Sequence, residues 1–230
     1  MDLKRLLPNF VRVFISMSGL SKIRFLVKNK YRSELDFWVN WSKDSNVSSN
    51  IEKVHTLWKK HRFLDEIIEM CGLTEKSKAL DVGCGLSSVL HFVEGERFAV
   101  DPLADEYVKL YNFGKIKVRK AYGEYLPFTD LFFDVVFCSN ALDHTSDPKK
   151  VISEIFRVLK YNGLAVVVVE VFDEHFRRDP GHPHVFRIQD VIKLTKNFHI
   201  VFKKVSTWNI KDCYDGIDEE RTDLVLVLKK

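Results

Sequence analysis

One stretch, residues 79–101, constrains the fold more than any other part of the chain. It reads ALDVGCGLSSVLHFVEGERFAVD: a short apolar run containing Asp81, a glycine turn, an apolar-periodic segment at 86–92, and a second short run that ends at Asp101. This order predicts a strand, a tight turn, a helix and a second strand, which form the first half of a nucleotide-binding βαβ unit. The sequence therefore favours an α/β fold.

The residue types in this stretch suit a ligand that contains a ribose. Gly83 and Gly85 let the backbone approach a ligand closely because they lack a Cβ. The helix expected at 86–92 would offer the unpaired N–H groups of its N-terminus. The carboxylate of Asp101, twenty positions after Asp81, can accept hydrogen bonds from both ribose hydroxyls. The alternative interpretation is an ordinary turn between a strand and a helix, with glycines for steric reasons alone.

The spacing of the glycines separates two classes of ligand. A dinucleotide fingerprint, G-x-G-x-x-G, requires glycine at position 88, where this chain has Ser88, and this disfavours an NAD-dependent oxidoreductase. The stretch instead resembles motif I of class I S-adenosylmethionine (SAM) methyltransferases, D-x-G-x-G-x-G after an apolar run, with Ser87 in place of the third glycine. The resemblance implies SAM as the cofactor and S-adenosylhomocysteine as the product.

A second block of motifs lies in residues 121–169. LPF at 126–128 precedes a buried strand expected at 133–138, Asp147 and Pro148 start a helix expected at 149–160, Asn162 and Gly163 end that helix, and an apolar strand follows at 166–169. This order resembles the type 11 methyltransferase family, and the resemblance covers roughly residues 60–205. It implies a Rossmann-like, seven-stranded, mostly parallel sheet with an antiparallel last strand and helices on both faces.

The remaining elements follow from apolar periodicity. We expect a helix at 51–71 that ends at Gly72, helices at 104–113 and 188–196, and strands at 116–119, 198–205 and 224–228, the last two as an antiparallel hairpin. Residues 42–50 are polar and predict a linker. Residues 51–230 are expected to form the SAM-binding domain, and residues 1–50 an N-terminal helical, basic and aromatic extension.

This extension allows two interpretations. Between positions 4 and 32 it carries eight basic residues and no acidic one. A basic amphipathic segment can lie on an anionic membrane surface. It can also pack on its own domain or across a homodimer. The aromatic stretch at 34–42 is expected to pack, or to form a lid over the substrate pocket, as N-terminal helices do in methyltransferases of the type that the chain resembles.

The resemblance implies positions for the cofactor contacts. Asp101 should hold the ribose, the glycine turn should follow the methionyl moiety, and Asp81 should lie near its amino group. The acid that contacts adenine in the family corresponds to Tyr122 here, which leaves Gly123 and Glu124 as candidates for the adenine edge. The candidate cofactor-binding residues are Asp81, Gly83, Cys84, Gly85, Asp101, Pro102, Gly123, Glu124, Ser139 and Asn140.

Four residues are candidates for catalysis. Asp143 and His144 follow the fourth expected strand, and His182 and His184 lie in the loop after the fifth. Methyl transfer from a sulfonium is an in-line displacement that chiefly requires positioning and exclusion of water. A general base is needed only if the acceptor must first lose a proton. The pair His182-x-His184 could suggest a metal, but the sequence shows no further ligands, and no metal is expected.

The composition and the missing motifs narrow the partners. We expect a small-molecule acceptor, such as a sugar, a lipid-linked compound or a secondary metabolite, methylated on oxygen or carbon. No D/N-P-P-Y/F motif follows the fourth strand, so DNA is not expected, whereas an RNA methyltransferase and a non-catalytic SAM-fold scaffold protein remain alternatives. Four cysteines without a C-x-x-C pair, and no apolar run long enough to span a bilayer, predict a cytoplasmic protein with reduced thiols.

Overall fold

The computed structural model describes residues 19–43, 47–174, 182–212 and 219–230. A seven-stranded sheet has the order β3-β2-β1-β4-β5-β7-β6. The strands are β1 (Lys78–Val82), β2 (Glu96–Asp101), β3 (Lys117–Lys120), β4 (Phe133–Ser139), β5 (Leu159–Glu170), β6 (His199–Asn209) and β7 (Glu220–Lys229). Only β7 runs antiparallel to its neighbours. The predicted Rossmann-like sheet with an antiparallel last strand is therefore confirmed.

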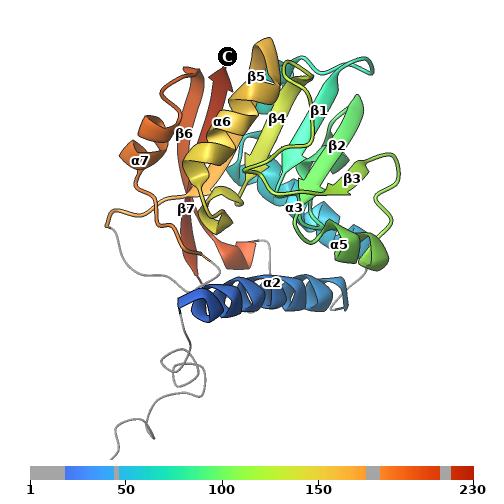
Figure 1. Cartoon of the computed structure of the whole chain (residues 1–230). Helices are drawn as coiled ribbons and strands as arrows, with labels where there is room; N and C mark the ends of the chain where they lie inside the picture. Colours follow the sequence, from blue (N-terminus) through green and yellow to red (C-terminus); the bar gives the residue numbers. More distant parts are fainter. Residues whose placement is uncertain (1–18, 44–46, 175–181, 213–218) are drawn as a thin grey trace, which may run out of the picture.

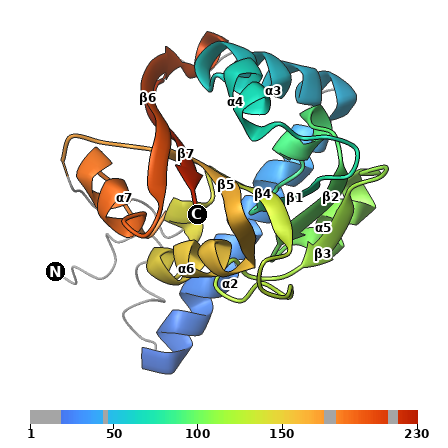
Figure 2. The ribbon, with the colours of Figure 1, turned by 90° about the horizontal axis from the view of Figure 1, so that it is seen from above.

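Helices cover both faces of this sheet (Figure 2). The helices α3 (Val47–His61), α4 (Leu64–Cys71) and α5 (Ala104–Leu110) pack on one face, and α6 (Pro148–Val158) and α7 (Ile188–Leu194) pack on the other. Successive side chains of a strand point to opposite faces. Ala79 accordingly joins the first hydrophobic cluster and Leu80 the second, which is why the buried runs of the central strands carry apolar residues on both faces.

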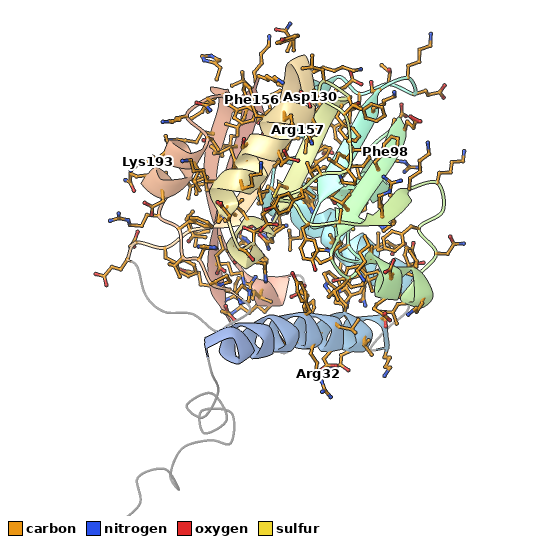
Figure 3. All side chains as sticks on the ribbon, viewed as in Figure 1. Arg32, Phe98, Asp130, Phe156, Arg157 and Lys193 are labelled. Atoms are coloured by element: carbon orange, nitrogen blue, oxygen red, sulfur yellow. The ribbon has the colours of Figure 1, made fainter. Side chains whose placement is uncertain are left out.

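The long helix α2 (Gly19–Lys43) lies across the edge of the sheet at which the parallel strands end (Figure 1). Trp38 packs edge-to-face on Trp41 and on Tyr107 of α5, with ring centroids 5.3 and 6.0 Å apart. Arg32 is exposed and points away from the sheet (Figure 3). Among the described residues, no helix combines the length and the apolar character that crossing a bilayer requires. Residues 1–18 of the predicted basic segment lie outside the described residues.

The segment before β1 differs from the expected elements at two places. The helix expected at 51–71 is two helices, because Phe63 adopts the left-handed conformation (φ 57°) between α3 and α4. The linker expected at 42–50 is helical from Val47, and the Asn50 side chain donates a 2.7 Å hydrogen bond to the Trp41 carbonyl oxygen. Gly72 (φ 54°) ends α4 as predicted.

The glycine turn is not followed by the helix expected at 86–92. Only a short 3-10 helix, η2 (Val89–Phe92), forms there. The Ser88 hydroxyl accepts a hydrogen bond from the Leu90 amide and donates one to Asp81, so that the chain bends at Ser88 before the turn of helix. The predicted anion-binding helix N-terminus is therefore absent from this turn.

The second motif block also ends differently. Helix α6 ends at Val158, not at 160, because Leu159 already pairs with Phe133 as part of β5. Asn162, with φ 63°, and Gly163 lie within β5 and do not end the helix.

Side chains of α6 hold the LPF segment at 126–128 in place through hydrogen bonds to its backbone. Arg157 donates hydrogen bonds to the carbonyl oxygens of Leu126 and Phe128, and Glu154 accepts one from the Leu126 amide. Arg157 also pairs with Asp130 at 2.7 Å, at the edge of the sheet opposite α2 (Figure 3). These contacts fix the loop before β4 onto α6, far from the carboxyl edge.

Candidate functional site

A cavity of about 980 Å³ lies between α2 and the carboxyl ends of β1, β2, β3 and β4. In open α/β sheets, ligands bind at this edge. All ten residues that the sequence singles out as cofactor contacts line the cavity, although they come from four separate segments of the chain. The topology therefore brings together what the sequence separates by up to 59 positions, between Asp81 and Asn140.

Asp81 lies at the end of β1 and is almost completely buried. Its Oδ2 accepts a 2.6 Å hydrogen bond from the Ser88 hydroxyl, whereas its Oδ1 has no hydrogen-bond partner among the described residues. Burial raises the pKa of this carboxyl to about 6. A buried acceptor without a partner is costly. Asp81 therefore presents an unsatisfied oxygen to a ligand that carries a donor or a positive charge.

Asp101 lies at the end of β2 and is also buried. Its two oxygens accept hydrogen bonds from the backbone amides of Leu103, at 2.8 Å, and Gly85, at 3.3 Å. Burial, together with the nearby carboxylates of Glu34 and Asp81, raises its pKa to about 7. Three acids therefore meet at this end of the cavity, and a cationic ligand would relieve their repulsion.

The glycine turn is shaped by close approaches on both sides. Gly83 has φ 76°, and a Cβ there would collide with the Ala141 side chain. Gly85 has φ 52°, and a Cβ there would collide with the ring of Trp38 on α2. The turn thus needs glycine both for its backbone conformation and for the space that it leaves to Ala141, in the segment after β4, and to Trp38 of α2.

Helix α2 supplies cavity-lining side chains, among them Trp38, which the sequence predicted only to pack or to form a lid. The Trp38 indole N–H donates a 2.8 Å hydrogen bond to Glu34, one helical turn earlier. Tyr31 lies edge-to-face with Tyr122, with ring centroids 6.3 Å apart. All four line the cavity. The aromatic stretch at 34–42 was the available signal, but the sequence could not show which of its faces meets the glycine turn.

Two predicted residues at the adenine side have structural partners. The Glu124 carboxylate accepts hydrogen bonds from the amides of Ser146, at 2.7 Å, and Asp147, at 3.2 Å, and so holds the loop that leads into α6. Tyr122 lines the cavity, whereas Tyr125 is 73% exposed and does not. Tyr122 is therefore the aromatic residue that a ligand here would meet.

The opposite end of the cavity contains a buried ion pair that sequence reasoning missed. Arg62, at the break between α3 and α4, donates a 2.9 Å hydrogen bond from Nε to Asp223 and a 3.2 Å hydrogen bond to the Ser139 hydroxyl. The Trp208 indole also donates to Asp223, at 3.1 Å. Lys59, Lys60 and His61 precede Arg62, so the sequence gave no signal that this arginine would be buried. The pair fixes Ser139 at the end of β4.

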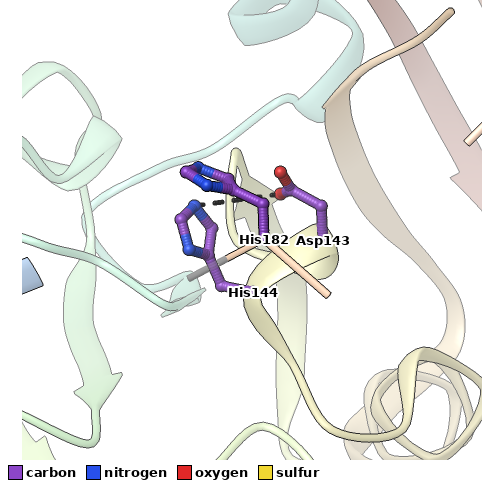
Figure 4. Close-up of side chains that lie close together, drawn as sticks. All are labelled: Asp143, His144 and His182. Atoms are coloured by element: carbon purple, nitrogen blue, oxygen red, sulfur yellow. Dashed lines mark ion pairs between the residues drawn. The ribbon is translucent and has the colours of Figure 1, made fainter. Parts of the chain in front are cut away.

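Asp143, His144 and His182 form a cluster beside this cavity (Figure 4). One side-chain ligand atom from each lies within 4.8 Å of those of the other two. His144 Nε2 is 4.0 Å from an Asp143 carboxylate oxygen, and the two imidazole rings have centroids 4.2 Å apart. Both histidines line the cavity. Sequence spacing did not reveal this group because 37 positions separate its histidines, between 145 and 181.

His184, the fourth catalytic candidate, is directed elsewhere. Its ring Nε2 is 3.0 Å from the Thr145 carbonyl oxygen, and its backbone N–H donates to the Asp143 carbonyl oxygen at 3.4 Å. The ring also stacks on Phe186. His184 does not line the cavity. It ties the loop after β5 to the segment after β4 and thereby positions His182 beside His144.

Comparison with known proteins shows that part of the chain is similar to methyltransferases. Residues 80–167 match the family model described as a methyltransferase domain. The uncharacterized methyltransferase YcgJ of Bacillus subtilis is 25% identical over 125 residues, which are 50% of this chain and 49% of that protein. The ubiquinone/menaquinone biosynthesis C-methyltransferase UbiE of Vibrio vulnificus is 33% identical over 129 residues, or 50% and 47%. The chain spans about half the length of these curated relatives.

Solved structures share the fold over a longer stretch. The crystal structure of Bacillus subtilis YcgJ aligns with a TM-score of 0.58 at 16% identity, covering 72% of this chain and 97% of that one. The [4+2]-cyclase SpnF aligns with a TM-score of 0.57 at 19% identity, covering 74% and 80%. These likenesses establish the fold and do not define the reaction.

Proposed function

Because this chain carries a class I SAM-dependent methyltransferase domain, we propose that it transfers the methyl group of SAM to a small-molecule acceptor, on oxygen or carbon. The observation that carries the proposal is the cavity, in which two buried carboxylates and a glycine turn meet at the carboxyl edge of the sheet.

The residues at the acidic end fit SAM. SAM carries a positive sulfonium and an ammonium group, and the unsatisfied Oδ1 of Asp81 supports binding of the ammonium there. Asp101, held by two backbone amides, supports acceptance of the ribose hydroxyls. Tyr122 and Gly123 line the wall beyond Asp101 and would border the adenine. The cluster of negative charge therefore complements the charge of the cofactor.

When bound, SAM supplies an electrophilic methyl group. The residues of this chain would contribute orientation, exclusion of water and removal of a proton. Trp38 covers the glycine turn and would exclude water from the donor. His144 and His182 line the same cavity and would take up the proton of an acceptor hydroxyl or acidic carbon. In the transfer, the acceptor atom gains the methyl group while the C–S bond breaks and sulfur keeps the electron pair.

The end of the cavity that contains Arg62 would bind the methyl acceptor, and it favours a compact molecule with both polar and ring-like surfaces. Trp58 and Trp208 line it together with Arg62 and Arg221. Indole rings stack on flat or sugar-like faces, and guanidinium groups bind oxygen-rich groups. The finer identity of the acceptor is part of this proposal, as is the division into an extension at 1–50 and a catalytic domain at 51–230. In that division α2 acts as the lid of the cavity, and residues 1–32 would contact an anionic membrane or a second copy.

The decisive experiment is calorimetric titration of the full chain with S-adenosylhomocysteine. We expect a dissociation constant of about a micromolar, weakened at least about tenfold in Asp101→Asn because the amide cannot accept from both hydroxyls. Asp105→Asn is the matched control, since Asp105 lies on the exposed side of α5 and pairs with Lys120. Absence of binding to the intact chain would refute the proposal.

Catalysis needs a second measurement. Methyl-tritiated SAM incubated with fractionated small-molecule extracts should label a compound only when the protein is present. If the cofactor binds but neither these fractions nor total RNA is labelled, the chain is a SAM-binding scaffold, the alternative that Ser87 and Tyr122 suggested. Labelling of RNA alone would point to an RNA methyltransferase.

A further inference from the structure

We propose that Asp143, His144 and His182 bind a divalent transition-metal ion at the acceptor side of the cavity. This goes beyond the sequence, which predicted no metal, and its catalytic consequence rests on the proposed methyl transfer. The single observation is that three side chains of metal-binding type, from two distant loops, bring their ligand atoms within 4.8 Å of one another (Figure 4).

The donor set has the composition of a metal centre. Two imidazole nitrogens and one carboxylate oxygen bind zinc, manganese, cobalt and iron in the divalent state. Each bond in such a centre is about 2.0–2.2 Å long. Ligand atoms that lie within 4.8 Å of one another can therefore close on one ion through small side-chain rotations. One negative charge and two neutral imidazoles would leave a bound divalent ion with a net positive charge.

The position of the cluster points to a catalytic ion, with coordination sites left for substrate. Asp143 is buried with a 5% exposed surface, whereas both histidines are partly exposed and line the cavity. A catalytic site keeps a coordination position for water or substrate, and a structural zinc site is closed by four protein ligands. Here Asp143 would bind the ion from the buried side, and the coordination positions left open would face the cavity.

Neighbouring contacts support the geometry of a ligand set. His184 fixes the loop that carries His182 through its bonds to the carbonyl oxygens of Thr145 and Asp143. Asp143 and His144 lie on the 3-10 helix η3 (Leu142–His144), whose His144 amide donates to the Ala141 carbonyl oxygen. Metal ligands are usually held by such outer contacts. His184 is therefore a positioning residue for the centre and is not one of its ligands.

The ion would activate an acceptor hydroxyl. Binding of the hydroxyl oxygen to a divalent cation lowers its pKa. While the ion is bound, His144 and His182 would act as its ligands and not as proton acceptors, so the proton of the hydroxyl would pass to bulk water. The oxygen would then attack the methyl carbon while the C–S bond breaks and its electron pair stays on sulfur. An acceptor with two neighbouring oxygens, such as a diol or a hydroxy acid, could chelate the ion and fits this arrangement best.

The test is direct metal binding to the full chain after chelator treatment. Co²⁺ absorption and Zn²⁺ calorimetry should both give one site per chain. The affinity should fall at least about tenfold in His182→Gln and in Asp143→Asn. His199→Gln is the matched control, because His199 lies exposed on the edge strand β6, and its affinity should equal that of the wild type.

The same samples distinguish this proposal from the proposed function. If S-adenosylhomocysteine binds but no metal does, or if His182→Gln binds metal as tightly as the wild type, the metal site is refuted and the proposed function stands. If one metal ion binds at the cluster but S-adenosylhomocysteine does not, the metal site stands and the proposed function fails. Circular dichroism of each variant confirms that a loss of binding is not a loss of fold.

Discussion

Replacement of Asp101 by asparagine should change how the stability of the ligand-free protein depends on pH. Burial raises the pKa of Asp101 from 3.8 to about 7. Since each pKa unit corresponds to about 1.36 kcal/mol, the ionised carboxylate lowers the free energy of unfolding by about 4 kcal/mol relative to its protonated form. A raised pKa means that this stability is present below about pH 4 and is lost as the pH rises through about 7.

The assay is urea unfolding of the ligand-free wild type and Asp101→Asn between about pH 4 and about pH 8. The other titrating groups are shared, so the difference between the two curves isolates Asp101. That difference should grow by about 4 kcal/mol in favour of the variant across this range. A constant offset of about 1–3 kcal/mol against the variant is expected, because its amide group faces two backbone donors.

The pH dependence of the difference in unfolding free energy between the two proteins tests whether Asp101 titrates with a raised pKa. If the difference stays constant with pH, Asp101 does not titrate with a raised pKa and the electrostatic account of the site is wrong. Saturation with S-adenosylhomocysteine at about 100 times its dissociation constant should add about 2.7 kcal/mol to the wild type. It should add much less to the variant, and Asp105→Asn should behave as the wild type in both measurements.

Three further predictions concern the same cavity. The affinity for SAM should increase as the pH rises from about 5.5 to about 8, since the cationic ligand binds the ionised forms of Asp81 and Asp101, whose pKa values are about 6 and about 7. Calorimetric titration at each pH measures this affinity, and an affinity that does not change with pH would contradict the prediction. Gly85→Ala should lower the free energy of unfolding by about 1–2 kcal/mol, because φ is 52° there. The change in tryptophan fluorescence on heating should also be larger in this variant, because the new methyl group displaces Trp38 of α2. An unchanged fluorescence signal would refute the contact between Gly85 and Trp38. Asp223→Leu should cost about 3–5 kcal/mol in urea unfolding, because it leaves Arg62 buried without its partner; a cost below about 1 kcal/mol would show that the pair is not buried.

The sequence predicted the sheet well because its apolar runs and glycine turn are local signals. β1, β2 and β4 lie where the strand pattern predicted them, and β5 contains the apolar run predicted at 166–169 but begins earlier, at Leu159. The burial of these strands on both faces explains why their apolar residues do not alternate with polar ones. The position of Asp81 and Asp101 in one cavity was also predictable, since both stand at strand ends, and the carboxyl ends of parallel strands meet at one edge of a sheet.

Local patterns failed where a side-chain contact overrides propensity. The helix expected at 86–92 gives way to a 3-10 turn because Ser88 bonds both Asp81 and the Leu90 amide. The helix expected at 51–71 breaks at Phe63, next to the residue that pairs with Asp223 across 161 positions. Contacts over such separations have no trace in periodicity.

The side chains of α2 that line the cavity and the cluster at His182 were missed for the same reason. Helical spacing predicted that residues 34–42 pack, but the partner of Trp38 is a glycine more than forty positions later. His182 lies beside His144 while His184, two residues later, bonds to backbone carbonyl oxygens of the segment after β4. Hydrogen bonds to carbonyl oxygens carry no sequence signature on the acceptor side.

The placement of α2 also has a kinetic consequence. The helix crosses the edge at which the parallel strands end, and Trp38 rests on the glycine turn, so a donor bound at that turn would lie beneath α2. We therefore expect exchange of the spent donor to wait for α2 to separate from the sheet, and turnover to follow the rate of that separation more closely than the rate of bond making. Helix α2 lies outside the segment 80–167 that matches the methyltransferase family model. It would then determine the turnover rate of a reaction that takes place at residues within that segment.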